Sequence, residues 1–144
     1  MISGTGQYDE LRSITPENNN RFQLHSFVSK DMALLMGAAD LVIARAGATT
    51  ILELAALRKP TILIPNAKLT GGHQLKNAAV YLEKDAVKVI NEEQMVEEPQ
   101  ILVDEIKSLL NDYDKSRVMG QIFGSFSRPD AARDVADMII SSAK

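Results

Sequence analysis

Short apolar runs alternate with longer amphipathic segments along the first ninety residues, and this alternation limits the possible folds more than any other feature of the sequence. Four runs have the length and character of strands: residues 22–27, 41–44, 61–64 and 86–90. Three segments between them have helical spacing: residues 30–39 with Ser29 as N-cap, 48–57 and 73–84. Strands that alternate with single helices predict a parallel sheet, and fully apolar strands predict helices on both of its faces. The predicted fold is therefore α/β, with a Rossmann-like parallel sheet.

The remainder of the chain predicts helices only. The expected segments are 99–110, 115–123 ended by Gly124, and 129–142 with Pro129 at a favourable helix start. No repeat or linker interrupts the sequence, so residues 1–144 are interpreted as a single domain. Residues 1–6 look like the end of a strand that enters a glycine turn. We therefore expect a domain that is truncated at its N-terminus and was cut from a larger protein.

Composition excludes several classes of function. A net charge of −3 over 144 residues argues against a nucleic-acid binder, which usually has a basic surface. The absence of cysteine excludes disulfides, and with only His25 and His73 there is no zinc motif, so no metal or other cofactor is expected. No apolar run is long enough to span a membrane, and no signal peptide is evident. The cytoplasm, or its membrane face, is the expected location.

The loop after the strand at 41–44 is the first candidate site. Ligands of open parallel sheets bind beyond the carboxyl ends of the strands. Here the loop carries Arg45 and the small residues Gly47, Ala48 and Thr49, which lead into a helix. Small residues let an anion such as a diphosphate approach the helix N-terminus, and Arg45 adds positive charge. A tight turn with a surface arginine is the alternative interpretation.

Glu53 is the only charged residue in the segment 51–57. A carboxylate among apolar residues must be solvated, paired or bound to a ligand, because its burial alone is costly. Its two oxygens can accept hydrogen bonds from both hydroxyls of a ribose. The alternative is an acid near a helix start, favoured there by the helix dipole.

Two more loops could contribute to the same site. The segment 66–72 ends in a glycine pair, and His73, Gln74 and Asn77 then place hydrogen-bonding groups at the start of the following helix. Backbone groups near Val28, which follows the strand at 22–27, could read a flat base. Either signal is also compatible with an ordinary polar turn.

Other motifs carry less weight. The acidic pair in Asp112-Tyr113-Asp114 lies at the end of an amphipathic helix, away from any strand end, and is interpreted as a solvated helix terminus. The sequence has no dinucleotide fingerprint, Walker motif or nucleophile elbow.

Taken in order, the segments 40–56, 59–65 and 71–78 resemble the C-terminal domain of the bacterial lipid II synthases, a family of GT-B glycosyltransferases. The resemblance extends to residues 3–6 and 129–132, and therefore covers nearly the whole chain. These enzymes transfer N-acetylglucosamine from UDP-N-acetylglucosamine to a lipid-linked muramoyl pentapeptide, lipid I, in peptidoglycan synthesis. The family often has two glutamines where this chain has His73-Gln74, so the detail of the sugar contacts differs.

The resemblance implies a role for each candidate residue. Glu53 would hold the ribose hydroxyls and the backbone at Val28 would read the uracil. The diphosphate and sugar would face Arg45 and the turn formed by Gly47, Ala48 and Thr49. The remaining positions, His73 and Gln74, would contact sugar hydroxyls.

The resemblance also implies what this chain does not supply. The family's proposed catalytic base lies in an N-terminal acceptor domain, so the fragment alone is expected to be inactive and to need that domain, or a partner chain, for transfer and for membrane contact. Inverting transfer in this fold uses no metal. Three alternatives remain: a donor-binding subunit of a split transferase, a related transferase with another lipid acceptor such as a diacylglycerol, and a flavodoxin-like binding module.

Overall fold

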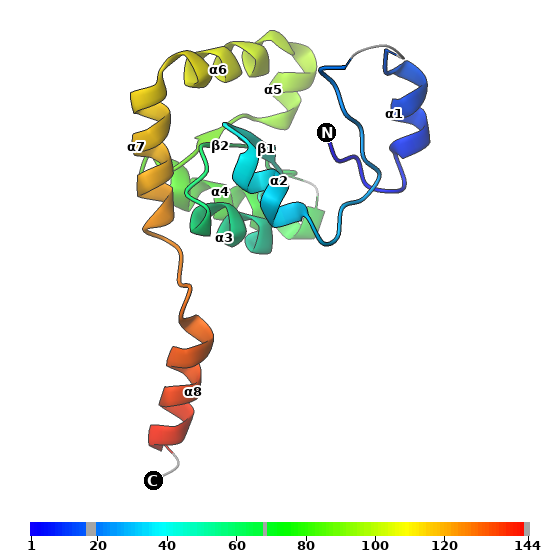
Figure 1. Cartoon of the computed structure of the whole chain (residues 1–144). Coiled ribbons are helices and arrows are strands. Elements are labelled where there is room, and N and C mark those ends of the chain that lie inside the picture. The colour runs from blue at the N-terminus through cyan, green and yellow to red at the C-terminus, as the bar shows by residue number, and fades with distance from the viewer. Residues whose placement is uncertain (17–19, 68, 143–144) are drawn as a thin grey trace. The chain divides into compact units, whose positions relative to one another are not determined.

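The computed structural model describes residues 1–16, 20–67 and 69–142. The chain divides into two compact units, Met1–Leu35 and Met36–Lys144, and each is described by itself. The elements are α1 (Tyr8–Ile14), α2 (Met32–Ala38), β1 (Val42–Ala44), α3 (Ala48–Ala56), β2 (Thr61–Leu63), the 3-10 turn η1 (Leu69–Gly72), α4 (His73–Leu82), β3 (Lys88–Val89), α5 (Glu92–Glu97), α6 (Gln100–Asn111), α7 (Tyr113–Gly124) and α8 (Ala131–Ser142) (Figure 1). That the two units form one domain stays a prediction.

The first unit corrects two predictions. The expected strand at 22–27 is reduced to a parallel bridge between Ile2 and His25, because within the described part of this unit only residues 1–3 pair with it. The bridge consists of Ser3 N–H donating to His25 O at 3.0 Å and His25 N–H donating to Met1 O at 2.9 Å. Ser29 is not the N-cap of the following helix, since α2 begins only at Met32. The helix α1 was not predicted.

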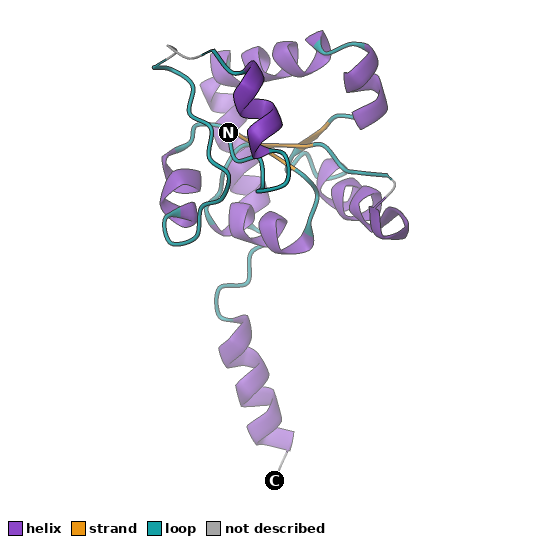
Figure 2. Ribbon diagram, turned by 90° about the vertical axis from the view of Figure 1, so that its right-hand side faces the viewer, coloured by secondary structure: helices purple, strands orange, loops and turns teal. Residues whose placement is uncertain are grey.

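The sheet lies in the second unit and is parallel, with strand order β1-β2-β3. Val42 pairs with Thr61, and Ile62 pairs with Lys88. Because α3 joins β1 to β2 and α4 joins β2 to β3, the second unit contains the predicted alternation of strands and single helices. Each strand is shorter than the apolar run that predicted it. Figure 2 shows the strands enclosed by helices.

Side chains from β2 point alternately to two apolar cores, as expected for a strand. Leu63 packs in the core shared with α3, α4 and Phe123 of α7. On the other face Ile62 and Ile64 pack with Leu109 of α6 and with Met119. Figure 1 shows α3 and α4 on one side of the strands and α5 and α6 on the other. The prediction of a sheet with helices on both faces is confirmed.

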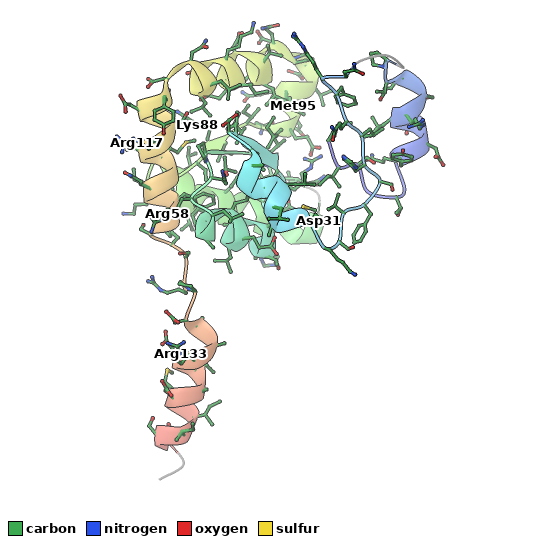
Figure 3. All side chains as sticks on the ribbon, in the orientation of Figure 1. Asp31, Arg58, Lys88, Met95, Arg117 and Arg133 are labelled. Atoms are coloured by element: carbon green, nitrogen blue, oxygen red, sulfur yellow. The ribbon has the colours of Figure 1, made fainter. Side chains whose placement is uncertain are left out.

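A close backbone contact fixes the C-terminal end of α3 against α7. A Cβ atom at Gly120 would lie 2.3 Å from the carbonyl oxygen of Arg58, so only glycine fits there. Arg58 itself adopts a positive φ of 52°, and Gly124 packs against its side chain. Figure 3 shows Arg58 beside α7. This contact packs the C-terminal end of α3 closely against α7.

The helical C-terminal region is also confirmed, with changed boundaries. The short helix α5 was not predicted, although Asn91 caps it by accepting hydrogen bonds from Glu93 N–H and Gln94 N–H at 2.8 and 3.1 Å. The N-cap of α7 is Asp112, which agrees with a helix terminus at the acidic pair. The last helix, α8, begins two residues after Pro129 and buries no residue. In the described ranges no helix is both long and apolar enough to cross a bilayer.

Candidate functional site

The exits of three parallel strands meet at one edge of the sheet in the second unit. Residues 45–47 follow β1, residues 64–72 follow β2, and residues 90–91 follow β3. This carboxyl edge is where ligands bind in open parallel sheets. Seven of the predicted site residues lie along it or on the two helices that leave it.

The N-terminus of α3 presents free backbone N–H groups. Gly47 is its N-cap, and among the described residues no side chain caps this end. The first intrahelical bond runs from Ile51 N–H to Gly47 O at 3.0 Å, which leaves the three preceding N–H groups without an acceptor in the helix. Ala48 and Thr49 are exposed, and a Cβ atom built on Gly47 meets nothing within 4 Å. The turn therefore has both the donors and the space that an anion needs.

Glu53 lies one turn further along α3, on the exposed face that also carries Thr49. The opposite face is buried through Ile51, Leu54 and Ala55. Within the ranges that the structure describes, the Glu53 carboxylate makes no ion pair and accepts no hydrogen bond, so its oxygens are free for a ligand. Glu53 is the sixth residue of the helix, beyond the first turn in which the dipole favours an acid. The helix-dipole interpretation therefore does not explain this residue.

Arg45 extends across the exit of β2 towards α5. Its Nη1 donates to Ile64 O at 3.2 Å, and its Nη2 lies 2.5 Å from Glu92 Oε1. Half of the Arg45 side chain remains exposed, compared with 29% of the Glu92 side chain. The guanidinium is therefore held above the ends of β2 and β3, with part of its surface open to solvent.

The first two turns of α4 are tied to both neighbouring loops. Gln74 Oε1 accepts a hydrogen bond from Asn66 N–H at 2.9 Å, and Asn77 Nδ2 donates to Ala46 O at 3.2 Å. The second bond brings α4 against the turn that starts α3. His73 is exposed at the first position of α4, after Gly72 with a positive φ of 80°. Within the predicted loop 66–72, Lys68 lies outside the described residues.

Val28 belongs to the first unit, where it is half-buried in a segment without regular secondary structure. That it shares a site with residues of the second unit stays a prediction.

A cavity of about 560 Å³ lies on the α5 side of the same edge. Its lining consists of Pro65, Asn66, Ala67, Leu75, Asn91, Glu92, Glu93, Val96 and Glu97. Asn66 and Ala67 belong to the predicted loop 66–72, but no residue that was assigned a contact with the ligand lines the cavity. In the described part of the chain, no group of three or more acidic or histidine side chains could hold a metal ion.

The sequence reasoning missed Glu92, which is the partner of Arg45. The rule that singled out the exits of the first strands applies equally to the exit of the strand at 86–90, and Asn91-Glu92-Glu93 follows it directly. That position was the available signal.

Residues 1–135 match the family described as the glycosyltransferase family 28 C-terminal domain. The chain belongs to this family. The match covers the strand exits, the uncapped helix start and Glu53. Family membership is therefore established for the region that contains the candidate site, while the role of each residue stays a prediction.

Two curated relatives are named UDP-N-acetylglucosamine–N-acetylmuramyl-(pentapeptide) pyrophosphoryl-undecaprenol N-acetylglucosamine transferase. The protein from Natranaerobius thermophilus is 34% identical over 145 residues, covering 97% of this chain and 39% of the relative. The protein from Chlorobium luteolum is 40% identical over 115 residues, covering 80% of this chain and 31% of the relative.

A solved structure agrees with these relatives. The crystal structure of Acinetobacter baumannii MurG matches with a TM-score of 0.80 at 25% identity, covering 97% of this chain and 40% of that protein. The chain thus has the α/β fold of one half of a GT-B glycosyltransferase. It spans about two fifths of the length of the relatives that it matches over most of its residues.

Proposed function

We propose that this chain binds UDP-N-acetylglucosamine as the donor half of an inverting glycosyltransferase that transfers N-acetylglucosamine to lipid I in peptidoglycan synthesis. The observation that carries the proposal is the pairing of the α3 N-terminus with a carboxylate one turn away, since neither has a side-chain partner among the described residues. An anionic diphosphate fits the first group and a ribose diol fits the second. The names of the relatives supply the sugar and the acceptor class.

The spacing along α3 supports this assignment. Thr49 and Glu53 are four residues apart, so they lie on the same face and are separated by about 6 Å along the helix axis. A nucleoside diphosphate could therefore bind with its ribose at Glu53 and its phosphates at Ala48 and Thr49. The sugar would then extend towards α4. There the bond from Asn66 N–H to Gln74 Oε1 fixes the amide, and its NH₂ has no hydrogen-bond partner among the described residues.

The chemistry of transfer follows from the same groups. When the bond between the sugar and the diphosphate breaks, negative charge accumulates on the departing UDP. The N–H groups of α3 and the guanidinium of Arg45 would stabilise that charge without a metal ion. The catalytic base is not among these residues, and we place it in the acceptor half, which would also bring the site to the cytoplasmic face of the membrane.

Donor binding can be tested on the 144-residue chain itself. Affinity would be measured by titration calorimetry for UDP-N-acetylglucosamine, UDP-glucose, UDP-galactose and UDP. We expect the N-acetylglucosamine donor to bind more tightly than the other two sugars. Equal affinity for all three sugars would contradict the sugar assignment but not nucleotide binding, whereas no binding of any probe at millimolar concentration would overturn the proposed function.

A further inference from the structure

The pair formed by Arg45 and Glu92 links the exits of all three strands. Arg45 follows β1, its hydrogen-bond acceptor Ile64 follows β2, and Glu92 follows β3 as the first residue of α5. The two charged residues are 47 positions apart in sequence. Their contact therefore depends on the sheet having formed and marks the edge where the diphosphate is expected.

Glu92 is the fixed member of the pair. Before it, Ile90 is buried and donates its N–H to Leu63 O at 2.9 Å, which anchors this point to the sheet. Asn91 then caps α5 through its side chain. The backbone of Arg45 is also anchored, because Ala44 O accepts from Ile64 N–H and Ala46 is buried, but Arg45 has the longer and more flexible side chain of the two. The less exposed carboxylate determines where the more exposed guanidinium lies.

The guanidinium still has donors to offer. Arginine carries five N–H donors in a fixed planar arrangement, and two are used here, one by Ile64 O and one by Glu92. An ion pair this exposed contributes little to folding stability. Its effect is on orientation, because a guanidinium already held in place loses less conformational freedom when it binds a phosphate.

We propose that Glu92 is a positioning residue that orients Arg45 for the donor diphosphate. This inference rests on the proposed function, because it takes the ligand to be a nucleoside diphosphate bound at the carboxyl edge. Glu92 does not contact the ligand, and its charge is balanced by Arg45. Removal of the carboxylate should therefore weaken binding of the diphosphate and leave binding of the nucleoside unchanged.

The test compares UDP with uridine, each titrated into the full 144-residue chain and followed by amide chemical shifts. In Glu92→Ala we expect the Kd of UDP to rise about 2- to 10-fold, the effect of one long side chain that must now be immobilised on binding, with no change for uridine. Glu92→Gln should bind UDP like the wild type, because its amide oxygen accepts the same N–H. In Arg45→Ala the affinity for UDP should fall further, and adding Glu92→Ala to that variant should have no additional effect.

Glu93→Ala is the matched control, since it removes a neighbouring carboxylate from the same helical turn and the Glu93 side chain has no ion pair among the described residues. It should bind both probes like the wild type. Unchanged uridine binding shows that each variant is folded.

Three results would overturn the inference. Tighter UDP binding in Glu92→Ala and Glu92→Gln would mean that the carboxylate competes with the diphosphate. Wild-type affinity in Glu92→Ala would mean that Arg45 needs no support, and the proposed function would stand. Failure of the wild-type chain to bind UDP would remove both proposals together.

Discussion

The helices α3 and α4 both start at the carboxyl edge of the sheet, but their first turns are built differently. The start of α3 has a three-residue loop, no side-chain cap among the described residues, and open space at Gly47. The start of α4 follows a longer loop, and two of its polar side chains already bond to neighbouring backbone groups at Asn66 and Ala46. The first turn of α3 is open to solvent, whereas the start of α4 is held by hydrogen bonds to neighbouring loops.

Under the proposed function, the two helix starts would bind different parts of the same ligand. An open helix start with unused N–H groups suits a diphosphate, which needs several donors and close approach. A helix start whose side chains are already hydrogen-bonded suits a neutral sugar. These side chains are held in fixed orientations for directional hydrogen bonds. The bond from Asn77 to Ala46 joins the two turns. Substitutions in α3 should therefore weaken binding of the nucleotide. Substitutions in α4 should weaken binding of the sugar or the contact between the two helix starts.

The largest effect is expected for Glu53→Gln. Loss of the charged acceptor should lower the affinities for UDP and for UDP-N-acetylglucosamine equally, by about 10- to 100-fold. Hydrogen bonds to charged groups contribute about 1.5–3 kcal/mol. Thermal stability should not change, because Glu53 is exposed. Calorimetry with UDP and 2′-deoxy-UDP measures this, and the deoxy probe should be less sensitive to the substitution. Glu83→Gln at the C-cap of α4, also exposed, is the control, and equal losses in both variants would contradict a ribose contact.

Gly47→Ala should come next, with UDP binding weakened about 10-fold, equivalent to about 1.4 kcal/mol. Apart from its chain neighbours, the added methyl group meets no atom of the described residues within 4 Å, so it would occupy the space assigned to the phosphates while the fold tolerates it. The measurement is the UDP affinity together with the melting temperature. Uridine binding should be nearly unaffected. A variant with a lowered melting temperature and normal UDP binding would show that Gly47 serves the fold instead.

Gln74→Glu should distinguish the contribution of the sugar to binding from that of the nucleotide. The new carboxylate can still accept from Asn66 N–H, but the NH₂ donor is lost. UDP-N-acetylglucosamine should bind about 2- to 10-fold more weakly, the contribution of one neutral hydrogen bond, while UDP keeps its affinity. Gln74→Leu, which removes donor and acceptor together, should weaken the sugar nucleotide at least as much. An equal loss for UDP would place the diphosphate, not the sugar, at α4.

The smallest effect on binding is expected for Asn77→Ala, which removes the bond between the two turns. The cost should appear as stability, about 0.5–1.5 kcal/mol, or a melting temperature lower by a few degrees. The affinities for UDP and UDP-N-acetylglucosamine should fall by less than twofold. Thermal unfolding followed by calorimetry measures the loss of stability, and ligand titrations measure the affinities. Lys76→Ala, on the exposed side of the same helix, is the control. A large loss restricted to the sugar nucleotide would make Asn77 a ligand contact.

The sequence predicted best those elements whose apolar pattern lies within one short segment of the chain. The helix α3 was predicted to within one residue, because Ile51, Leu54 and Ala55 form an apolar stripe at helical spacing. The strand at 22–27 was not, because a strand needs a partner and this segment has only the bridge to Ile2 within its described unit. The short helices α1 and α5 carry no strong apolar stripe, so periodicity missed them.

The site shows the same limit. The loop at Gly47 was singled out because it directly follows a predicted strand, and Glu53 because it is the only charged residue in the segment 51–57, while their roles stay predictions. The side-chain direction of Arg45 could not be found in this way. It depends on Glu92, which is brought close by two crossovers of the sheet. The bonds of Gln74 and Asn77 to neighbouring loops likewise depend on packing between segments distant in sequence.

The most direct test of the open α3 turn is a titration of the ¹⁵N-labelled chain with UDP, followed through every backbone amide. If the diphosphate binds the start of α3, the largest saturable shifts should occur at Ala48 and Thr49, with smaller ones at Glu53 and little change at Glu93 or Val96 in the cavity beside α5. Saturable shifts centred on that cavity, with Ala48 and Thr49 unmoved, would contradict the assignment of the nucleotide to α3.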